Sequence, residues 1–395
     1  MAHKIRVLQV ITRLIIGGAQ ETVMLSADLL DKSRWAVRVL SGPQTGSEGS
    51  LIENVRERAI PLVIEPALVR EISPFKDLLA LFRLARFMRQ GRYTIVHTNS
   101  SKAGVLGRWA AYLAGVPIIV HTVHGWGHHE RQHPWVRRFY ILLEQLTQRI
   151  TDKLIVVSPL NTEKGLADGI AAPEKYVTIR SGIELDRFRH PARSPEAVRA
   201  ELGIPLDSPL VGTVTRLSPQ KAPLDFVVAA AQVAVQVPDV HFIIVGDGPL
   251  RPEVEAEIAA CGLTGRIHLT GLRRDIPDLM HSFDLFALSS LWEGLPRVLP
   301  QAMAAGLPIV ATAIDGNAEA VTDGLNGRLV PPGEPSALAQ ALIALLRDPD
   351  TARRLGRAGL ARVHEFGAVK MADDIAHLYE TLLEAKGLAE NDVLC

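Results

Sequence analysis

The clearest chemistry in the sequence lies between residues 290 and 312, in S-L-W-E-G-L-P-R-V-L-P-Q-A-M-A-A-G-L-P-I-V-A-T. Glu293 stands beside a glycine where a loop meets a helix, and Gln301 follows eight residues later, where a second carboxylate would complete a pair. A helix N-terminus has free N–H groups and a positive dipole end, which suit phosphate. A carboxylate next to it can accept hydrogen bonds from hydroxyls. The stretch therefore predicts a site for a sugar attached to a nucleoside diphosphate.

Two cations, Arg216 and Lys221, occur five residues apart in T-R-L-S-P-Q-K. Arg216 follows an apolar strand-like run, and Lys221 opens the next helical pattern. Two cations in these positions could neutralise a diphosphate without a metal ion. They could also be ordinary surface charge, so the sequence leaves both interpretations open.

Two segments of the first half could also bind a ligand. Gly17 and Gly18 lie between a strand-like run and a helix, where backbone can approach an anion closely; an ordinary tight turn has the same pattern. His124, in T-V-H-G, lies at the carboxyl end of a strand, which is the ligand-binding edge of a parallel sheet. The imidazole could donate to a sugar hydroxyl or stabilise charge near the reacting carbon, or it could simply be a polar residue that ends a strand.

The five residues H-E-R-Q-H at positions 129–133 match the H-E-x-x-H pattern of zinc proteases. That chemistry requires both histidines on one face of a helix. Two glycines, Gly125 and Gly127, precede the motif, and Pro134 fits the first position of the following helix. We therefore expect the motif to lie in a loop and expect no metal site. A zinc peptidase is the rival interpretation, and metal analysis would decide between the two.

Length and composition limit the other possibilities. A chain of 395 residues is long enough for two domains with full cores. Its two cysteines, Cys261 and Cys395, are too few for a disulfide framework and fit a reducing compartment. The first residues form a strand pattern broken by charges rather than a signal peptide, and no apolar run approaches membrane-spanning length. We expect a cytoplasmic protein.

The charge is zero overall but unevenly distributed. Residues 1–185 hold 24 basic and 16 acidic side chains, and residues 72–153 alone hold 12 and 4. Lys76, Arg83, Arg86 and Arg89 share one arc of a predicted helix over residues 75–92, and aromatic residues stand beside cations at 135–140. Such a basic amphipathic surface can lie on anionic lipid, although a solvated helix face over the core has the same pattern. A peripheral location at the cytoplasmic face of a membrane is one interpretation.

Short β-branched runs alternate with helical patterns, which predicts parallel sheets covered by helices. The predicted strands are residues 5–11, 37–40, 62–64, 95–98, 118–123, 154–158, 177–180, 210–214, 241–246, 266–270, 285–289, 308–312 and 327–330. We expect an N-terminal Rossmann-like domain over residues 1–187, a proline-rich linker over 188–208 and a second doubly wound domain over 209–366. Each would bind ligand at the carboxyl ends of its strands, so a ligand between them would touch both.

These segments, in this order, resemble glycosyltransferase family 4, whose members are retaining enzymes of GT-B fold. The resemblance runs from Val7 to about Phe366. It rests on G-G-A-Q-E at 17, H-T-N-S-S-K-A-G-V-L-G-R at 97, V-H-T-V-H-G at 120, S-G-I-E at 181, T-R-L-S-P-Q-K at 215, V-G-D-G-P at 245, E-G-L-P at 293 and D-G-L-N-G at 323. The ordered set is far more specific than any single motif.

The resemblance implies an α/β protein of two Rossmann-like domains that face an interdomain cleft, with the donor held mainly by the C-terminal domain and the acceptor by the N-terminal one. Arg216 and Lys221 would hold the donor diphosphate, and Glu293 would bind hydroxyls of the transferred sugar with the backbone N–H groups of Gly294 and Leu295.

The resemblance also assigns the remaining positions. The loop with Gly271 and Arg273 would carry the base, while His124 and the Gly17-Gly18 turn would meet the donor from the other side. A last helix over residues 367–388 would cross back to the N-terminal domain. The family is typically metal-independent.

Two departures from the family pattern stand out. Ser181-Gly182-Ile183-Glu184 replaces the usual Asn-Gly-Ile-Asp, which is a mild change. The larger one is Gln301, where the family has a glutamate that accepts hydrogen bonds from the ribose hydroxyls. A glutamine oxygen still accepts but carries no charge, which weakens donor binding by about 1 kcal/mol, and the lost negative charge near the diphosphate offsets part of that. We expect a working enzyme.

The resulting prediction is a retaining glycosyltransferase that moves a hexose or N-acetylhexosamine from a nucleotide-diphosphate sugar, with UDP implied by the family, to a glycan or lipid-linked acceptor. No nucleic-acid partner is expected. A GT-B nucleotide-sugar epimerase and a non-catalytic GT-B binding subunit are the alternatives.

Overall fold

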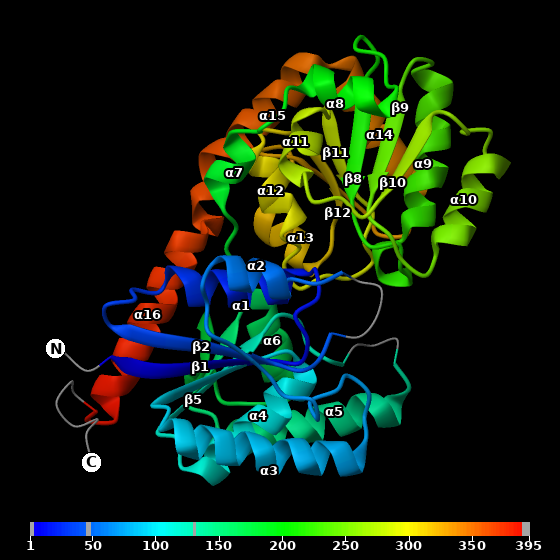
Figure 1. Cartoon of the computed structure of the whole chain (residues 1–395). Coiled ribbons are helices and arrows are strands. Elements are labelled where there is room, and N and C mark those ends of the chain that lie inside the picture. The colour runs from blue at the N-terminus through cyan, green and yellow to red at the C-terminus, as the bar shows by residue number, and fades with distance from the viewer. Residues whose placement is uncertain (1–3, 45–48, 129–131, 389–395) are drawn as a thin grey trace. The chain divides into compact units, whose positions relative to one another are not determined.

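The computed structural model describes residues 4–44, 49–128 and 132–388 of the chain (Figure 1). The chain divides into two compact units. The first is formed by residues 1–182 and 368–395, and the second by residues 183–367. Each unit holds one parallel sheet covered by helices, so the predicted fold class, two doubly wound α/β domains, is confirmed.

The first unit holds a seven-stranded parallel sheet in the order β3-β2-β1-β4-β5-β6-β7. Its strands are β1 (Ile5–Ile11), β2 (Trp35–Ser41), β3 (Leu62–Ile64), β4 (Ile95–Asn99), β5 (Ile118–Val123), β6 (Lys153–Val156) and β7 (Tyr176–Thr178). The order reverses between β1 and β4, which places the ends of β1, β4 and β5 at the switch point where doubly wound sheets bind ligands.

Helices cover both faces of this sheet, and the alternation of side chains along the strands decides which helix meets which residue. They are α1 (Gly18–Leu29), α2 (Ile52–Glu57), α3 (Pro74–Gly91), α4 (Ser101–Ala114), α5 (Pro134–Thr147), α6 (Pro159–Ala167) and α16 (Ala368–Ala385). Val7 and Val120 pack with α1 and α16, whereas Leu8 and Val96 pack with α3 and α4. Figure 1 shows α16, in red, alongside β1 and β2.

The second unit holds a six-stranded parallel sheet in the order β10-β9-β8-β11-β12-β13. Its strands are β8 (Leu210–Val214), β9 (His241–Val245), β10 (Ile267–Gly271), β11 (Leu285–Leu288), β12 (Ile309–Thr312) and β13 (Arg328–Val330). Its helices are α7 (Leu185–Arg189), α8 (Pro195–Leu202), α9 (Pro223–Gln236), α10 (Arg251–Ala260), α11 (Ile276–His281), α12 (Val298–Ala304), α13 (Asp315–Ala320), α14 (Pro335–Arg347) and α15 (Pro349–Arg362). Here the order reverses between β8 and β11, so the loops after these two strands form the expected ligand-binding edge.

Residues 188–208 differ from the predicted linker, because they carry helix α8 and pack into the second unit. Arg199 of α8 is only 8% exposed, and its guanidinium donates to the carbonyls of Ser282, Leu206 and Ser208 at 2.8–3.0 Å. It also pairs with Asp284 at 2.8 Å. Two prolines of this stretch fit the helix, because Pro195 occupies the first turn of α8 and Pro205 follows its end, where proline is tolerated.

Candidate functional site

Glu293 and Lys221 form an ion pair at the carboxyl ends of neighbouring strands. Lys221 lies in a short 3₁₀ turn after β8, and Glu293 lies in the loop after β11, which pairs with β8. The hydroxyl of Ser290 donates to the same Glu293 oxygen, Oε1, at 2.8 Å. The Glu293 side chain is only 7% exposed, so these partners replace the water that would otherwise bind its oxygens.

Further hydrogen bonds hold the two loops together. The Leu291 backbone N–H donates to the Gln220 carbonyl at 2.8 Å, and the Gln220 side-chain amide donates to the Trp292 carbonyl at 2.8 Å. The hydroxyl of Ser289 donates to the Lys221 carbonyl at 3.0 Å. These bonds tie the backbone that carries Lys221 to the backbone that carries Glu293, so the two charges are positioned as one unit.

Arg216 lies on the same connection as Lys221, two residues beyond β8, at an exposed position. The nearby Leu217 is fully buried, and its backbone N–H donates to the Asp247 carbonyl at 3.1 Å. The connection therefore presents one exposed cation and one partly buried cation at the ligand-binding edge of the sheet.

The loop after Glu293 is packed against the start of α13. A Cβ on Gly316 would lie 1.9 Å from the Gly294 carbonyl oxygen and 2.9 Å from the Leu295 Cα, so only glycine fits there. The hydroxyl of Thr312, at the end of β12, donates to the Ser290 carbonyl at 2.6 Å. Gly316 and Thr312 were not among the predicted site residues, although their place just after a parallel strand is a signal that could have found them.

Gln301 lies at the middle of α12, and its backbone N–H donates to the Arg297 carbonyl at 3.0 Å. The side chain is partly exposed. The structure thus places Gln301, Gly294 and Leu295 on one continuous loop-to-helix segment that starts at Glu293.

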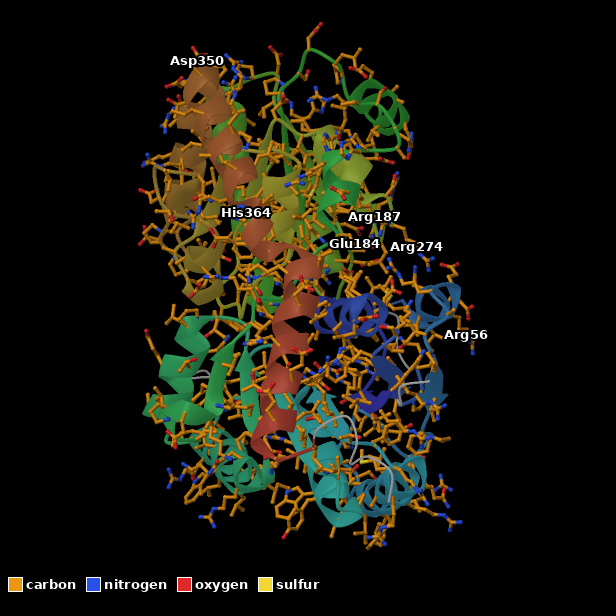
Figure 2. The ribbon with its side chains drawn as sticks, turned by 90° about the vertical axis from the view of Figure 1, so that its left-hand side faces the viewer. Arg56, Glu184, Arg187, Arg274, Asp350 and His364 are labelled. Carbon is orange, nitrogen blue, oxygen red and sulfur yellow. The ribbon has the colours of Figure 1, made fainter. Side chains whose placement is uncertain are left out.

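Gly271 is the last residue of β10, and Arg273 lies two residues beyond it. Gly271 has a φ of +67°, which favours glycine, and its carbonyl accepts from the Gly246 N–H at 2.9 Å. The Arg273 guanidinium binds Asp275 at 2.8 Å and Glu201 at 2.8 Å, and these hydrogen bonds raise its pKa. The structure therefore brings Arg273 to two carboxylates of its own unit, while the neighbouring Arg274 is exposed (Figure 2).

The remaining predicted residues lie in the first unit. His124 is half-buried just beyond β5, and its Nε2 lies 3.0 Å from Asn99 Oδ1. Gly17 precedes α1 in an extended conformation, and its carbonyl accepts from the Glu21 N–H at 3.0 Å. The Gly18 carbonyl accepts from the Thr22 hydroxyl at 2.9 Å. The structure thus divides the predicted site residues between its two units, with His124, Gly17 and Gly18 in the first and the rest in the second.

The H-E-x-x-H pattern falls partly outside the described residues, since residues 129–131 are not among them. His133 precedes α5, and Pro134 occupies the first turn of that helix. Within residues 4–44, 49–128 and 132–388, no group of three or more histidine, cysteine or carboxylate side chains is arranged to hold a metal ion.

Comparison with known proteins places the chain in a family. Residues 17–182 match the model of the glycosyl transferase 4-like domain, and residues 194–362 match that of the glycosyl transferases group 1. An Escherichia coli protein named UDP-Gal:alpha-D-GlcNAc-diphosphoundecaprenol alpha-1,3-galactosyltransferase is 32% identical over 382 residues, which covers 95% of this chain and 97% of the relative. The chain therefore belongs to the GT-B glycosyltransferases, and it is a glycosyltransferase enzyme.

Solved structures agree with this fold. HepE (Alr3699) of Anabaena in complex with UDP-glucose is 25% identical, has a TM-score of 0.82, and is matched over 95% of this chain and 99% of HepE. WaaG, a glycosyltransferase involved in lipopolysaccharide biosynthesis, has a TM-score of 0.73 at 18% identity, with 94% and 99% covered.

Proposed function

We propose that the protein transfers a hexosyl or N-acetylhexosaminyl group from a UDP-sugar to a glycan or lipid-linked acceptor, with retention of configuration, as in glycosyltransferase family 4. The Lys221–Glu293 pair carries the proposal, because it sets a cation for phosphate beside a carboxylate for hydroxyls. The names of two similar proteins support it. The Escherichia coli relative is named for a UDP-Gal donor and a diphosphoundecaprenol-linked GlcNAc, and HepE is described with UDP-glucose.

Donor binding would exchange the partners of the ion pair. The Lys221 ammonium would pair with a diphosphate oxygen, and a sugar hydroxyl would donate to the Glu293 carboxylate. Neither charge would be left buried without a partner, which avoids the large cost of an uncompensated buried charge. Ser290 would keep its hydrogen bond to Glu293 during the exchange and hold the carboxylate in place.

In the reaction, the bond between the anomeric carbon and the phosphate oxygen breaks through an oxocarbenium-like state. Lys221 and Arg216 would stabilise the negative charge of the departing diphosphate, while the N–H groups of Gly294 and Leu295 would donate to hydroxyl oxygens of the transferred sugar. The acceptor hydroxyl would attack from the face that the diphosphate leaves, forming the new glycosidic bond, and its proton would pass to the leaving phosphate. His124 would lie near the reacting carbon. Two cations on one connection support the proposal that no metal ion is required.

An acceptor on a lipid carrier would require the protein to reach a membrane surface. The described helices include none that combines the length and apolar content needed to cross a bilayer. However, Phe75 and Phe82 of α3 are 89% and 60% exposed, and Trp135 of α5 is 79% exposed. The buried residues of α3 are Ala80, Leu84 and Met88, which form its core-facing stripe. The exposed aromatic side chains are therefore not needed to pack this helix against the core.

The same two helices also carry exposed cations. Lys76, Arg83 and Arg86 of α3 and Arg138 of α5 are exposed. We therefore propose a cytoplasmic protein that binds the membrane peripherally through α3 and α5, since apolar insertion combined with basic charge favours anionic lipid. Sedimentation with vesicles containing phosphatidylglycerol tests this. Phe75→Ser combined with Trp135→Ser should abolish binding, whereas Val235→Ser, at an 81% exposed position of the second unit, should not. Equal binding by all forms would contradict the proposal.

A panel of nucleotide sugars, scored for binding and for transfer to a lipid-linked or free glycan, tests the main proposal. Release of UDP that depends on acceptor, with anomeric NMR showing the donor configuration in the product, is the expected result. Inversion would refute the retaining mechanism. Acceptor-independent conversion of the sugar would indicate an epimerase, and donor binding without either reaction would indicate a binding subunit.

A further inference from the structure

One face of the first sheet changes from apolar to polar along its central strands. The residues that meet α1 and α16 begin as Ile5 and Val7 on β1, Ile95 on β4, and Ile118 and Val120 on β5. Toward the carboxyl ends, the same alternation places Gln9, His97, Asn99 and Thr122 on this face. All four are at most 5% exposed, and buried polar side chains require hydrogen-bond partners.

Tyr379 of α16 supplies the first partner. Its hydroxyl lies 2.7 Å from His97 Nδ1, and His97 Nε2 lies 2.6 Å from the Thr122 hydroxyl. Burial lowers the pKa of His97 to about 3 and raises the pKa of Tyr379, so both side chains are neutral at pH 7. A neutral imidazole has one donor and one acceptor nitrogen, so each of its contacts has a direction.

Gln9 lies beside both of these side chains. Its amide nitrogen lies 3.2 Å from His97 Nδ1, 3.3 Å from the Tyr379 oxygen and 3.4 Å from the Ser26 hydroxyl oxygen. The Ser26 hydroxyl donates to the Val23 carbonyl at 3.0 Å, so its oxygen can only accept from Gln9. The Gln9 nitrogen therefore faces Tyr379 and Ser26, and its oxygen faces the other way.

Asn99 links Gln9 to His124. The Asn99 amide nitrogen donates to Gln9 Oε1 at 2.9 Å, which turns the Asn99 oxygen toward His124 Nε2, at 3.0 Å. An amide oxygen only accepts, so His124 must carry a proton on Nε2. If the side-chain amides of Gln9 and Asn99 both rotated by half a turn, the Asn99 N–H group would face His124 Nε2. A neutral His124 would then carry its proton on Nδ1.

We propose that Tyr379 is a positioning residue, which holds the ring of His124 and the proton on its Nε2 through Gln9 and Asn99. Helix α16 would thereby set the state of a histidine at the acceptor side of the reaction. The inference rests on the proposed function, since that function gives His124 its place beside the reacting sugar.

Tyr379→Phe tests the proposal, because phenylalanine keeps the ring that packs edge-on against Trp35 at 5.5 Å and removes only the hydroxyl. We expect kcat to fall about tenfold with little change in the KM for the donor, as for other residues that orient a reacting side chain. Nitrogen NMR of labelled His124 should show a lower proton occupancy at Nε2 than in the unchanged protein. Ile375→Val, which trims a buried side chain of the same helix, is the control for lost stability and should leave kcat and the NMR signal unchanged.

A second arm separates positioning from general damage. In a His124→Ala background, Tyr379→Phe should lower kcat no further, because the residue through which it acts is gone. An equal fall in both backgrounds, or an unchanged His124 signal in Tyr379→Phe, would overturn the proposal. If no donor is turned over, the proposed function fails, while the NMR signal of His124 still decides the role of Tyr379.

Discussion

Gly316 lies against Gly294 so closely that a single added carbon would stand 1.9 Å from the Gly294 carbonyl oxygen. The obstacle is backbone, which cannot rotate away as a flexible side chain can. The start of α13 therefore sets the position of the loop whose N–H groups we assign to the donor.

Gly316→Ala should displace this loop and weaken binding of a UDP-sugar by about tenfold or more, the loss expected when a binding group moves by about an ångström. Isothermal titration with the donor or with UDP measures the effect. Ala318→Ser, at an exposed position of the same helix, is the matched control and should bind normally. Unchanged binding by Gly316→Ala would mean that this loop is not part of the donor site.

Lys221→Met should be more harmful to folding than Glu293→Gln. The first change leaves a carboxylate that is 7% exposed without its cation, at a cost of about 1–3 kcal/mol, whereas glutamine is neutral and can keep the Ser290 hydrogen bond. Both variants should lose about 100-fold or more in kcat/KM, because each removes a group that meets the donor. Urea unfolding and donor kinetics measure the two effects.

The exposed pair of Arg353 and Asp350 is the control for loss of an ion pair as such, with side chains 60% and 92% exposed. Arg353→Met should leave stability and kinetics close to normal. A Lys221→Met enzyme with full activity would remove the proposed role of the pair.

Gln301→Glu tests whether the neutral ribose contact limits the enzyme. We expect kcat/KM to change by less than about tenfold, because the gain of a charge-assisted hydrogen bond is about 1 kcal/mol and the added negative charge opposes the diphosphate. Steady-state kinetics with the preferred donor measure it. An increase of several orders of magnitude would instead indicate that the natural enzyme has lost activity.

Stability should fall in mild acid because of His97. Burial lowers its folded-state pKa from 6.5 to about 3, so the unfolded chain binds a proton there that the folded protein does not. The stability is highest above pH 6.5 and falls as the pH falls toward 3. By pH 5 the free energy of unfolding has decreased by about 2 kcal/mol. Urea unfolding between pH 7 and 5 should show a shallower dependence for His97→Gln than for the wild type. His190→Gln, at an exposed position, should keep the wild-type slope.

Arg199→Met tests the assignment of residues 188–208 to the second unit. Its guanidinium holds three carbonyls and Asp284, so its loss should destabilise that unit by about 3–5 kcal/mol. Chemical unfolding measures this loss. An unchanged unfolding midpoint would indicate that residues 188–208 form a linker and not part of the second unit.

The strands were predictable because each is a short β-branched run between helical patterns, and sites at strand ends followed from the parallel sheets. Sequence placed Lys221 and Glu293 at such ends. It could not pair them, because their contact depends on β8 and β11 being neighbours although β9 and β10 lie between them in the chain. The ion pair between Arg273 and Glu201 could not be predicted for a similar reason, since the two residues lie 72 positions apart in the chain.

The helix that contains Tyr379 has a consequence for how the protein is made. The core around Val7 and Val120 includes Tyr379, so the first unit lacks part of its interior until residues 368–385 have left the ribosome. By then the whole second unit has been synthesised. The strands of the first unit therefore lack the α16 side chains of their core until then. A chain that stops early would expose apolar strands to chaperones and proteases, so few incomplete copies would persist.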